Sequence, residues 1–282
     1  MGASAPTTVV STPFFIVSAG RSGAARMAKA LATAEGVTIE HDYMAEHIRP
    51  LAVRRYQGLA DERAAKATLA AAHGAALRSA RTRLWGDSSN TLSWLIPELA
   101  ELFPDARFIH VVRDGRKVAR AYFHEPGEEC YGDRSTGILA DYLLGRTADP
   151  PPAERKYWWP QPKSGEPWAK EFARFNRFQR IVWHWSELNR VVLRDLKDVP
   201  EHRRLFVRFE DLRAQPSTVT SLLGFLGIPY RDALCSAFAR PHNSSHPDIK
   251  PAPEQAAQFA LLATPMMKRL GYAGQAEYAV NY

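Results

Sequence analysis

The feature that most constrains the fold of this chain lies near its amino end, in residues 13–31. Residues 14–17 are a short run of aromatic and β-branched side chains, which is typical of a strand buried on both faces. A turn of small residues with one arginine follows at 18–23, and residues 24–31 are strong helix formers whose apolar members share one face. Strand, glycine turn and helix in this order direct several backbone N–H groups and the positive end of a helix dipole to one point. The stretch predicts a phosphate-binding loop, the alternative being an ordinary turn between a strand and a helix.

The spacing of the glycines argues against the usual nucleoside triphosphate loop, and so against a kinase. That loop needs two glycines separated by four residues, then a lysine and a hydroxyl residue that binds magnesium. Here Gly20 and Gly23 stand closer together, and Ala24 and Ala25 follow where the hydroxyl is required. We expect the loop to hold a phosphate ester without a metal, with Arg21 as its charged donor.

The rest of the chain alternates predicted strands with predicted helices. Further strands are expected at 37–40, 83–86, 107–112 and 205–209. Helices are expected at 91–103, 117–124, 168–196, 217–226 and 253–270, with two more between 44 and 81 that are separated near Asp61, a candidate N-cap. The alternation predicts an α/β fold in which a central parallel sheet is flanked by helices on both faces. We expect residues 1–282 to form one domain.

Residues 124–167 interrupt this alternation with an irregular, proline-rich segment. The segment is too long for a plain loop, so we interpret it as a functional insertion or lid. It contains Tyr157, Trp158 and Trp159, three aromatic side chains that are hard to bury in such a segment. They either line an apolar pocket for a substrate or form a local cluster that fixes the insertion in place.

The net charge of +7 indicates an anionic partner, although the basic residues are spread along the chain. A nucleic-acid groove usually shows a concentrated basic stripe, so a small polyanion is favoured over nucleic acid. Cys130 and Cys235 have neither metal-site spacing nor the number that a disulfide framework needs, and a reducing, cytoplasmic setting is expected. No signal peptide and no transmembrane segment is predicted. The composition does not determine an oligomeric state.

Polar side chains follow four of the predicted strands, at 18–23, 40–43, 86–90 and 113–116. In open parallel sheets, ligands bind in the crevice outside the carboxyl ends of the strands. The four clusters are therefore expected to meet in one crevice that combines an anion site with titratable groups.

Three blocks of this sequence resemble the sulfotransferase family. SAGRSGAARMAKAL resembles the loop that holds the 5′-phosphosulfate of 3′-phosphoadenosine 5′-phosphosulfate (PAPS), and FPDARFIHVVRDGRKVARAYFH resembles the block that holds its 3′-phosphate. LFVRFEDLRAQPSTVTSLLGFLGI is similar to the family's third block. The resemblance implies a P-loop-NTPase-like sulfotransferase fold, PAPS as co-substrate and no metal. It also implies transfer of the sulfonate to a hydroxyl or amine of a small-molecule or lipid-like acceptor.

The resemblance also implies which residues hold PAPS. The carried-over positions are Gly20, Arg21, Ser22, Gly23, Ala24, Ala25 and Arg26 in the first block and Arg113 and Ala121 in the second. Alanines stand at 24, 25 and 121 where the family has hydroxyl side chains. Each lost hydrogen bond to a charged group costs about 1.5–3 kcal/mol, so the alternative is a non-catalytic relative that binds a nucleotide or a protein partner.

Sulfonate transfer needs a base for the acceptor proton, cations and N–H groups for the developing charge, and in-line attack. In the family the base follows the second or the third strand. His41 is the first candidate, with Asp42 or Glu40 either orienting it or replacing it. Asp87 is a further candidate base, although capping of the next helix is its more ordinary role. Residues 87–89 supply no cation where many family members have one.

Several other polar and aromatic residues are assigned structural roles. His110 is expected to be a hydrogen-bonded core histidine, and Trp183 and Trp185 are expected to lie in the core. Glu210 and Asp211 are expected to tie the last strand to its neighbours, and Asp114 and Arg116 to pair with each other. Residues 240–246 resemble the family's loop that closes over the 3′-phosphate.

Overall fold

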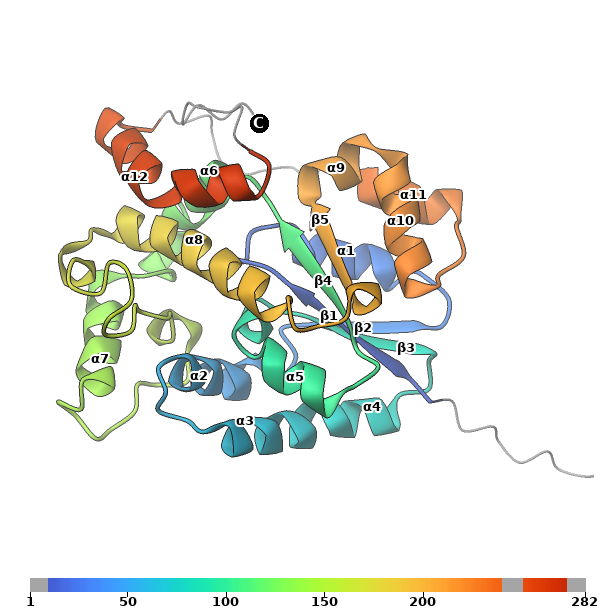
Figure 1. Cartoon of the computed structure of the whole chain (residues 1–282), viewed down its shortest axis with the longest axis horizontal. Helices are drawn as coiled ribbons and strands as arrows, with labels where there is room; N and C mark the ends of the chain where they lie inside the picture. Colours follow the sequence, from blue (N-terminus) through green and yellow to red (C-terminus); the bar gives the residue numbers. More distant parts are fainter. Residues whose placement is uncertain (1–9, 240–250, 273–282) are drawn as a thin grey trace, which may run out of the picture.

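The computed structural model describes residues 10–239 and 251–272 and contains a five-stranded sheet with helices on both faces (Figure 1). The strands are β1 (Thr12–Val17), β2 (Val37–His41), β3 (Leu84–Ser88), β4 (Arg107–Val112) and β5 (Arg204–Arg208). Their order in the sheet is β2-β3-β1-β4-β5, and every neighbouring pair is parallel. The predicted α/β fold with a central parallel sheet is confirmed.

The helices divide between the two faces of the sheet. Those on one face are α1 (Ala24–Leu31), α9 (Phe209–Ala214), α10 (Pro216–Leu226) and α11 (Asp232–Ala239). Those on the other face are α2 (Ala45–Tyr56), α3 (Glu62–Leu69), α4 (Ala75–Ser79), α5 (Ile96–Leu102), α6 (Gly115–Phe123), α8 (Arg177–Asp195) and α12 (Pro253–Arg269). Figure 1 shows α12 lying against α8, and α9, α10 and α11 gathered beside β5.

The central strand β1 is buried on both faces, as its apolar run predicts. Phe14 and Ile16 belong to the core under α1 and α10, whereas Phe15 and Val17 belong to the core under α5 and α8. None of these four side chains is exposed to solvent. This burial fixes the position of the turn that follows β1, and with it the predicted phosphate loop.

Two predicted boundaries near β3 are wrong. The strand does not stop at residue 86 but continues through Asp87 and Ser88, which pair with Glu40 and His41 of β2. The expected helix at 91–103 is divided into a 3₁₀ turn, η2 (Thr91–Trp94), and α5. Asp87 is accommodated in this interior strand because its carboxylate has partners in His73 and Tyr43.

The segment at 124–167 and the long helix after it also differ from expectation. The insertion is not irregular throughout, because it contains α7 (Asp133–Leu143). The helix expected over 168–196 begins only at Arg177, since Trp168 has a left-handed φ of 69° and Asn176 caps the helix. The side chain of Asn176 accepts from the Gln179 N–H, and that of Gln179 accepts from the Asn176 N–H, which forms a capping box.

The helical stretch between β2 and β3 confirms Asp61 as an N-cap, since its side chain accepts from the Ala64 N–H at 2.7 Å. Between α3 and α4 the chain forms a π-helical turn, η1 (Ala70–Gly74), which was not predicted. Residues 240–246, expected to close over the donor, lie outside the described residues. Among the residues that are described, no helix is both long and apolar enough to pass through a lipid bilayer.

Candidate functional site

The turn between β1 and α1 has the backbone that the glycine spacing predicts. Gly20, Arg21 and Gly23 all have left-handed φ values, of 73°, 49° and 88°. The Ser93 side chain holds the start of the turn in place. Its hydroxyl accepts from the Ser18 N–H at 3.0 Å and donates to the Ser18 carbonyl at 3.2 Å. The chain therefore enters α1 through a tight, held turn, and the first N–H groups of that helix have no acceptor within it.

Both glycines of the turn are required by close neighbours as well as by their φ values. A Cβ on Gly20 would overlap with the hydroxyl of Tyr122, which itself donates to the Ala19 carbonyl at 3.1 Å. A Cβ on Gly23 would overlap with the ring of Phe209. The turn thus packs directly against α6 and α9, the helices that follow β4 and β5.

The polar side chains of the turn already have partners within the protein. Arg21 forms an ion pair with Glu125, Ser22 donates to the Gly20 carbonyl at 2.9 Å, and Arg26 donates to the Phe238 carbonyl at 3.2 Å. An anion in the turn would therefore rely on backbone N–H groups and would compete with the Glu125 carboxylate for Arg21.

Arg113, predicted to bind a 3′-phosphate, lies beside the turn between β1 and α1. Its Nη1 donates to the Arg21 carbonyl at 3.0 Å, and its guanidinium lies 5.7 Å from the centre of the Phe209 ring. Ala121 lies on α6 and presents no polar group. Arg116 forks onto Asp114, which also caps α6, so the predicted pairing of these two residues is confirmed. The structure thus joins the loops after β1 and β4.

The predicted base candidates lie at the end of β2, where they contact the end of β3. The Nδ1 of His41 is 2.6 Å from the Ser88 carbonyl oxygen. Because a carbonyl only accepts, Nδ1 must carry the hydrogen, and Nε2 is then the proton acceptor in the neutral ring. Asp42, with a left-handed φ of 57°, accepts from the Ser89 hydroxyl at 2.6 Å. Glu40, the residue before His41, is exposed.

Asp87 does not cap the helix that follows it, so that prediction is wrong. It is fully buried within β3, where one carboxylate oxygen lies 3.0 Å from Nε2 of His73 and the other accepts from the Tyr43 N–H at 3.2 Å. Burial raises the pKa of this carboxyl, and the contacts to His73 and Tyr43 partly oppose the increase. Sequence reasoning missed His73 because it stands in the unpredicted π-helical turn, which places its ring against Phe15.

The other predicted structural residues lie as expected. His110 is buried with its Nε2 2.9 Å from the Asn189 side-chain oxygen, and Trp183 and Trp185 are buried in the core. Glu210 accepts from the Asp114 N–H at 3.1 Å and from the Tyr272 hydroxyl at 2.8 Å. Asp211 pairs with Arg208 at the end of β5. These contacts tie α9 to the loop after β4.

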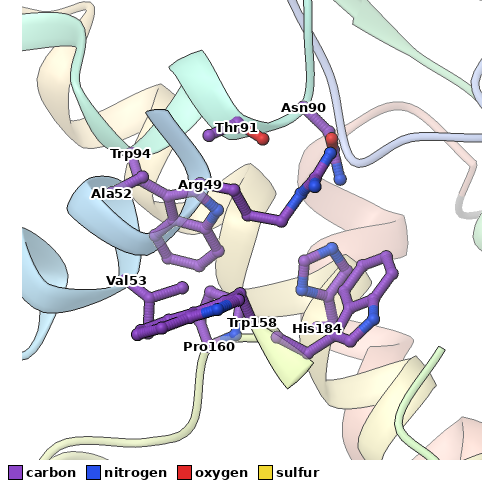
Figure 2. A pocket seen from close by; sticks show the side chains of 10 residues that line it. Arg49, Ala52, Val53, Asn90, Thr91, Trp94, Trp158, Pro160 and His184 are labelled. Atoms are coloured by element: carbon purple, nitrogen blue, oxygen red, sulfur yellow. The ribbon is translucent and has the colours of Figure 1, made fainter. Parts of the chain in front are cut away.

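A narrow pocket opens beside these loops, between α2, η2, α8 and the insertion (Figure 2). Its lining residues are Arg49, Ala52, Val53, Asn90, Thr91, Trp94, Trp158, Trp159, Pro160 and His184. Figure 2 shows Arg49 extending across the pocket toward Asn90, with Trp158 on the opposite wall. The cavity measures about 10 Å³, room for a single water molecule. Burial lowers the pKa of His184 to about 3, so its ring is neutral.

The two tryptophans of the insertion form the local cluster that was one of the two alternatives, and they also line this narrow pocket. Each indole N–H donates to a carbonyl of the insertion at 2.7 Å, Trp158 to Pro152 and Trp159 to Glu129. Both side chains also line the pocket and are almost fully buried. The cluster therefore fixes the insertion in place and forms one wall of the pocket.

Comparisons with known proteins bear on the family resemblance and on the fold. The model of the sulfotransferase family matches residues 13–142, which include the loop after β1, the end of β2 and Arg113. Over these residues the chain is similar to the sulfotransferase family, and the predicted resemblance is confirmed. No curated protein sequence matches the chain.

A solved structure of a sulfotransferase shares the fold. A sulfotransferase from Alicyclobacillus acidocaldarius is similar at a TM-score of 0.52 and 14% identity, over 92% of this chain and 94% of that one. One from Mycobacterium avium has a TM-score of 0.49 at 11% identity, over 92% and 77% of the two chains. The sulfotransferase domain from the curacin biosynthetic pathway has a TM-score of 0.47 at 16% identity, over 81% and 77%.

Proposed function

We propose that the protein transfers a sulfonate group from PAPS to a hydroxyl or amine of a small-molecule acceptor. The observation that carries the proposal is the contact between the loops after β1 and β4. Arg113 donates to the Arg21 carbonyl, so the two blocks that resemble a 5′- and a 3′-phosphate site lie side by side at the carboxyl edge of the sheet.

The residues present fit such a donor through backbone rather than hydroxyl groups. The N–H groups of Ala24 and Ala25 belong to the first turn of α1, which leaves them free for an anion. Arg113 supplies a fork of donors that suits a phosphate. When bound, PAPS supplies an activated sulfonate on a phosphate leaving group.

The end of β2 supplies the proton acceptor. As the acceptor oxygen or nitrogen bonds to sulfur, the bond from sulfur to the bridging phosphate oxygen breaks and leaves its electron pair on that oxygen. The proton of the acceptor then passes to His41 or Asp42. The Ser88 carbonyl orients the His41 ring with Nε2 as the acceptor, and Ser89 holds the Asp42 carboxylate.

A binding titration with the product 3′-phosphoadenosine 5′-phosphate (PAP) tests this proposal. We expect the wild type to bind PAP, and Arg113→Ala to bind it about 10- to 100-fold more weakly, the equivalent of one charged hydrogen bond. The matched control is Arg63→Ala, an exposed arginine on α3, which should bind like the wild type.

Two other results would contradict the proposal or favour its alternative. Absence of PAP binding by the wild type would contradict the proposal. PAP binding without sulfonate transfer to any of a panel of phenols, alcohols and amines would favour the alternative of a non-catalytic nucleotide-binding relative, for which Ala24, Ala25 and Ala121 are the motivating positions.

A further inference from the structure

The insertion brings a second arginine to the loop after β1. Arg155 begins a short 3₁₀ turn, η4 (Arg155–Tyr157), and its Nη1 lies 3.3 Å from Oε1 of Glu125. The same oxygen accepts from Arg21 of the loop. Two guanidinium groups, one from the loop and one from the insertion, thus share a single carboxylate oxygen.

Aromatic rings hold Arg155 in this position. Its guanidinium lies 5.1 Å from the centre of the Trp159 ring and 6.0 Å from that of Tyr122, the residue that packs against Gly20. Arg21 lies 5.6 Å from the Tyr122 ring. Planar guanidinium groups stack well on such rings, so both arginines are oriented beside the turn before any ligand binds.

The environment of Glu125 between the two arginines is unfavourable for its carboxylate. Its side chain is only 12% exposed, and its second oxygen, Oε2, is buried without a hydrogen-bond partner in the part of the chain that the structure describes. A buried carboxylate oxygen that lacks a donor is unfavourable. Glu125 thus meets both guanidinium groups through one oxygen, whereas an anion with several outward oxygens offers a separate oxygen to each arginine.

Arg155 also lies within the electrostatic reach of the candidate base. Burial is the largest influence on the pKa of Arg155 and lowers it, but Tyr122, Glu125 and Asp42 are among the groups that raise it overall. The guanidinium thus lies beside the predicted phosphate loop, through Glu125 and Tyr122, and close enough to β2 for the Asp42 carboxylate to influence it. The group being transferred must pass through this region if the loop holds the donor and β2 holds the base.

The transfer requires a cation where negative charge develops on the sulfonate and the bridging oxygen. Residues 87–89 at the end of β3 bring none, because Asp87 is buried against His73 and two serines follow it. We propose that Arg155 supplies this cation from the insertion, and that Glu125 is its resting partner, displaced when the donor binds. This inference rests on the proposed sulfonate transfer.

The test compares PAP, which lacks the sulfonate, with PAPS, which carries it. We expect Arg155→Gln to bind PAP within about twofold of the wild type but PAPS about tenfold more weakly, with partial recovery in Arg155→Lys. Binding is followed by calorimetry and by the fluorescence of Trp159, on which Arg155 stacks. The matched control is Lys156→Gln, the next residue, which pairs with Glu154 and should bind both ligands normally.

Glu125→Gln tests the resting partner. Removal of the carboxylate charge should tighten the binding of inorganic pyrophosphate several-fold, because the anion no longer displaces Glu125 from Arg21 and Arg155. The same gain should be absent in the double variant Glu125→Gln/Arg155→Gln.

The inference fails if Arg155→Gln weakens PAP and PAPS equally, or affects neither, while the wild type binds both; the proposed function would then stand without it. If the wild type binds neither nucleotide, the proposed function fails. In that case pyrophosphate binding tests the anion site alone. If the wild type binds pyrophosphate and Arg155→Gln does not, an anion site at Arg155 is supported. If Arg155→Gln binds pyrophosphate as the wild type does, or if the wild type does not bind it, the anion site is contradicted.

Discussion

Gly20 combines two constraints that can be separated by experiment. Its φ of 73° is unfavourable for any other residue, and a Cβ there would overlap with the Tyr122 hydroxyl. Gly145 has a similar φ of 69° but open space around its Cβ direction. Gly145→Ala should therefore lower the free energy of unfolding by only about 1–2 kcal/mol, the backbone penalty alone.

Gly20→Ala should cost more than Gly145→Ala and should abolish PAP binding, because the turn must move away from α6. Urea unfolding measures the loss of stability, and calorimetry measures the loss of PAP binding. In the double variant Gly20→Ala/Tyr122→Phe, part of the lost stability should return, since the overlapping oxygen is gone. Equal unfolding free energies for Gly20→Ala and Gly145→Ala would show that close packing does not constrain the turn.

Single residues of the site were predictable where a local pattern marks them. Gly20, Gly23 and Arg113 belong to strand–turn–helix patterns, and the structure brings their loops together. Arg155 and His73 carry no such pattern. Arg155 reaches the loop only because the insertion folds back onto α6, and His73 points at Asp87 only because a π-helical turn rotates it inward.

At the scale of elements, the start of α8 shows how a helical pattern can mislead. The sequence predicts one helix from residue 168, and Trp168, Phe172, Phe175 and Phe178 keep a spacing that suits one helix face. The positive φ of Trp168 and the capping box at Asn176 exclude residues 168–176 from the helix, which begins at Arg177. The capping box itself was visible in the sequence as Asn176 and Gln179, three residues apart.

The capping box leads to a prediction for α8. Asn176→Ala should lower the free energy of unfolding by about 1 kcal/mol, because the Gln179 N–H loses its acceptor. Asn176→Asp keeps an acceptor oxygen at the same place and should remain close to the wild type. Urea unfolding of the three proteins decides the matter, and a loss in Asn176→Asp as large as that in Asn176→Ala would contradict a capping role.

At the scale of the whole molecule, the sheet was the most predictable part. The strands that carry its core are short apolar runs, and their parallel pairing follows from their alternation with helices. The boundaries that failed lie where tertiary partners override propensity, as at Asp87 in β3.

Two buried histidines should make the whole molecule less stable in mild acid. Burial lowers the pKa of His110 to about 4 and that of His184 to about 3, against about 6.5 in the unfolded chain. Between pH 6.5 and 4 the unfolded chain therefore binds protons that the folded protein does not, and the free energy of unfolding falls as the pH falls. The raised pKa of Asp87 acts in the opposite direction, since its buried carboxylate costs stability at higher pH.

His110→Gln isolates one of these contributions. From pH 7 to pH 5 the wild type should lose about 2 kcal/mol more unfolding free energy than this variant, which is the protonation of one histidine in the unfolded chain only. His202→Gln, at an exposed histidine, should keep the pH dependence of the wild type. If the profiles of wild type and His110→Gln run parallel, His110 is protonated equally in both states, and its burial against Asn189 does not exclude the charged ring.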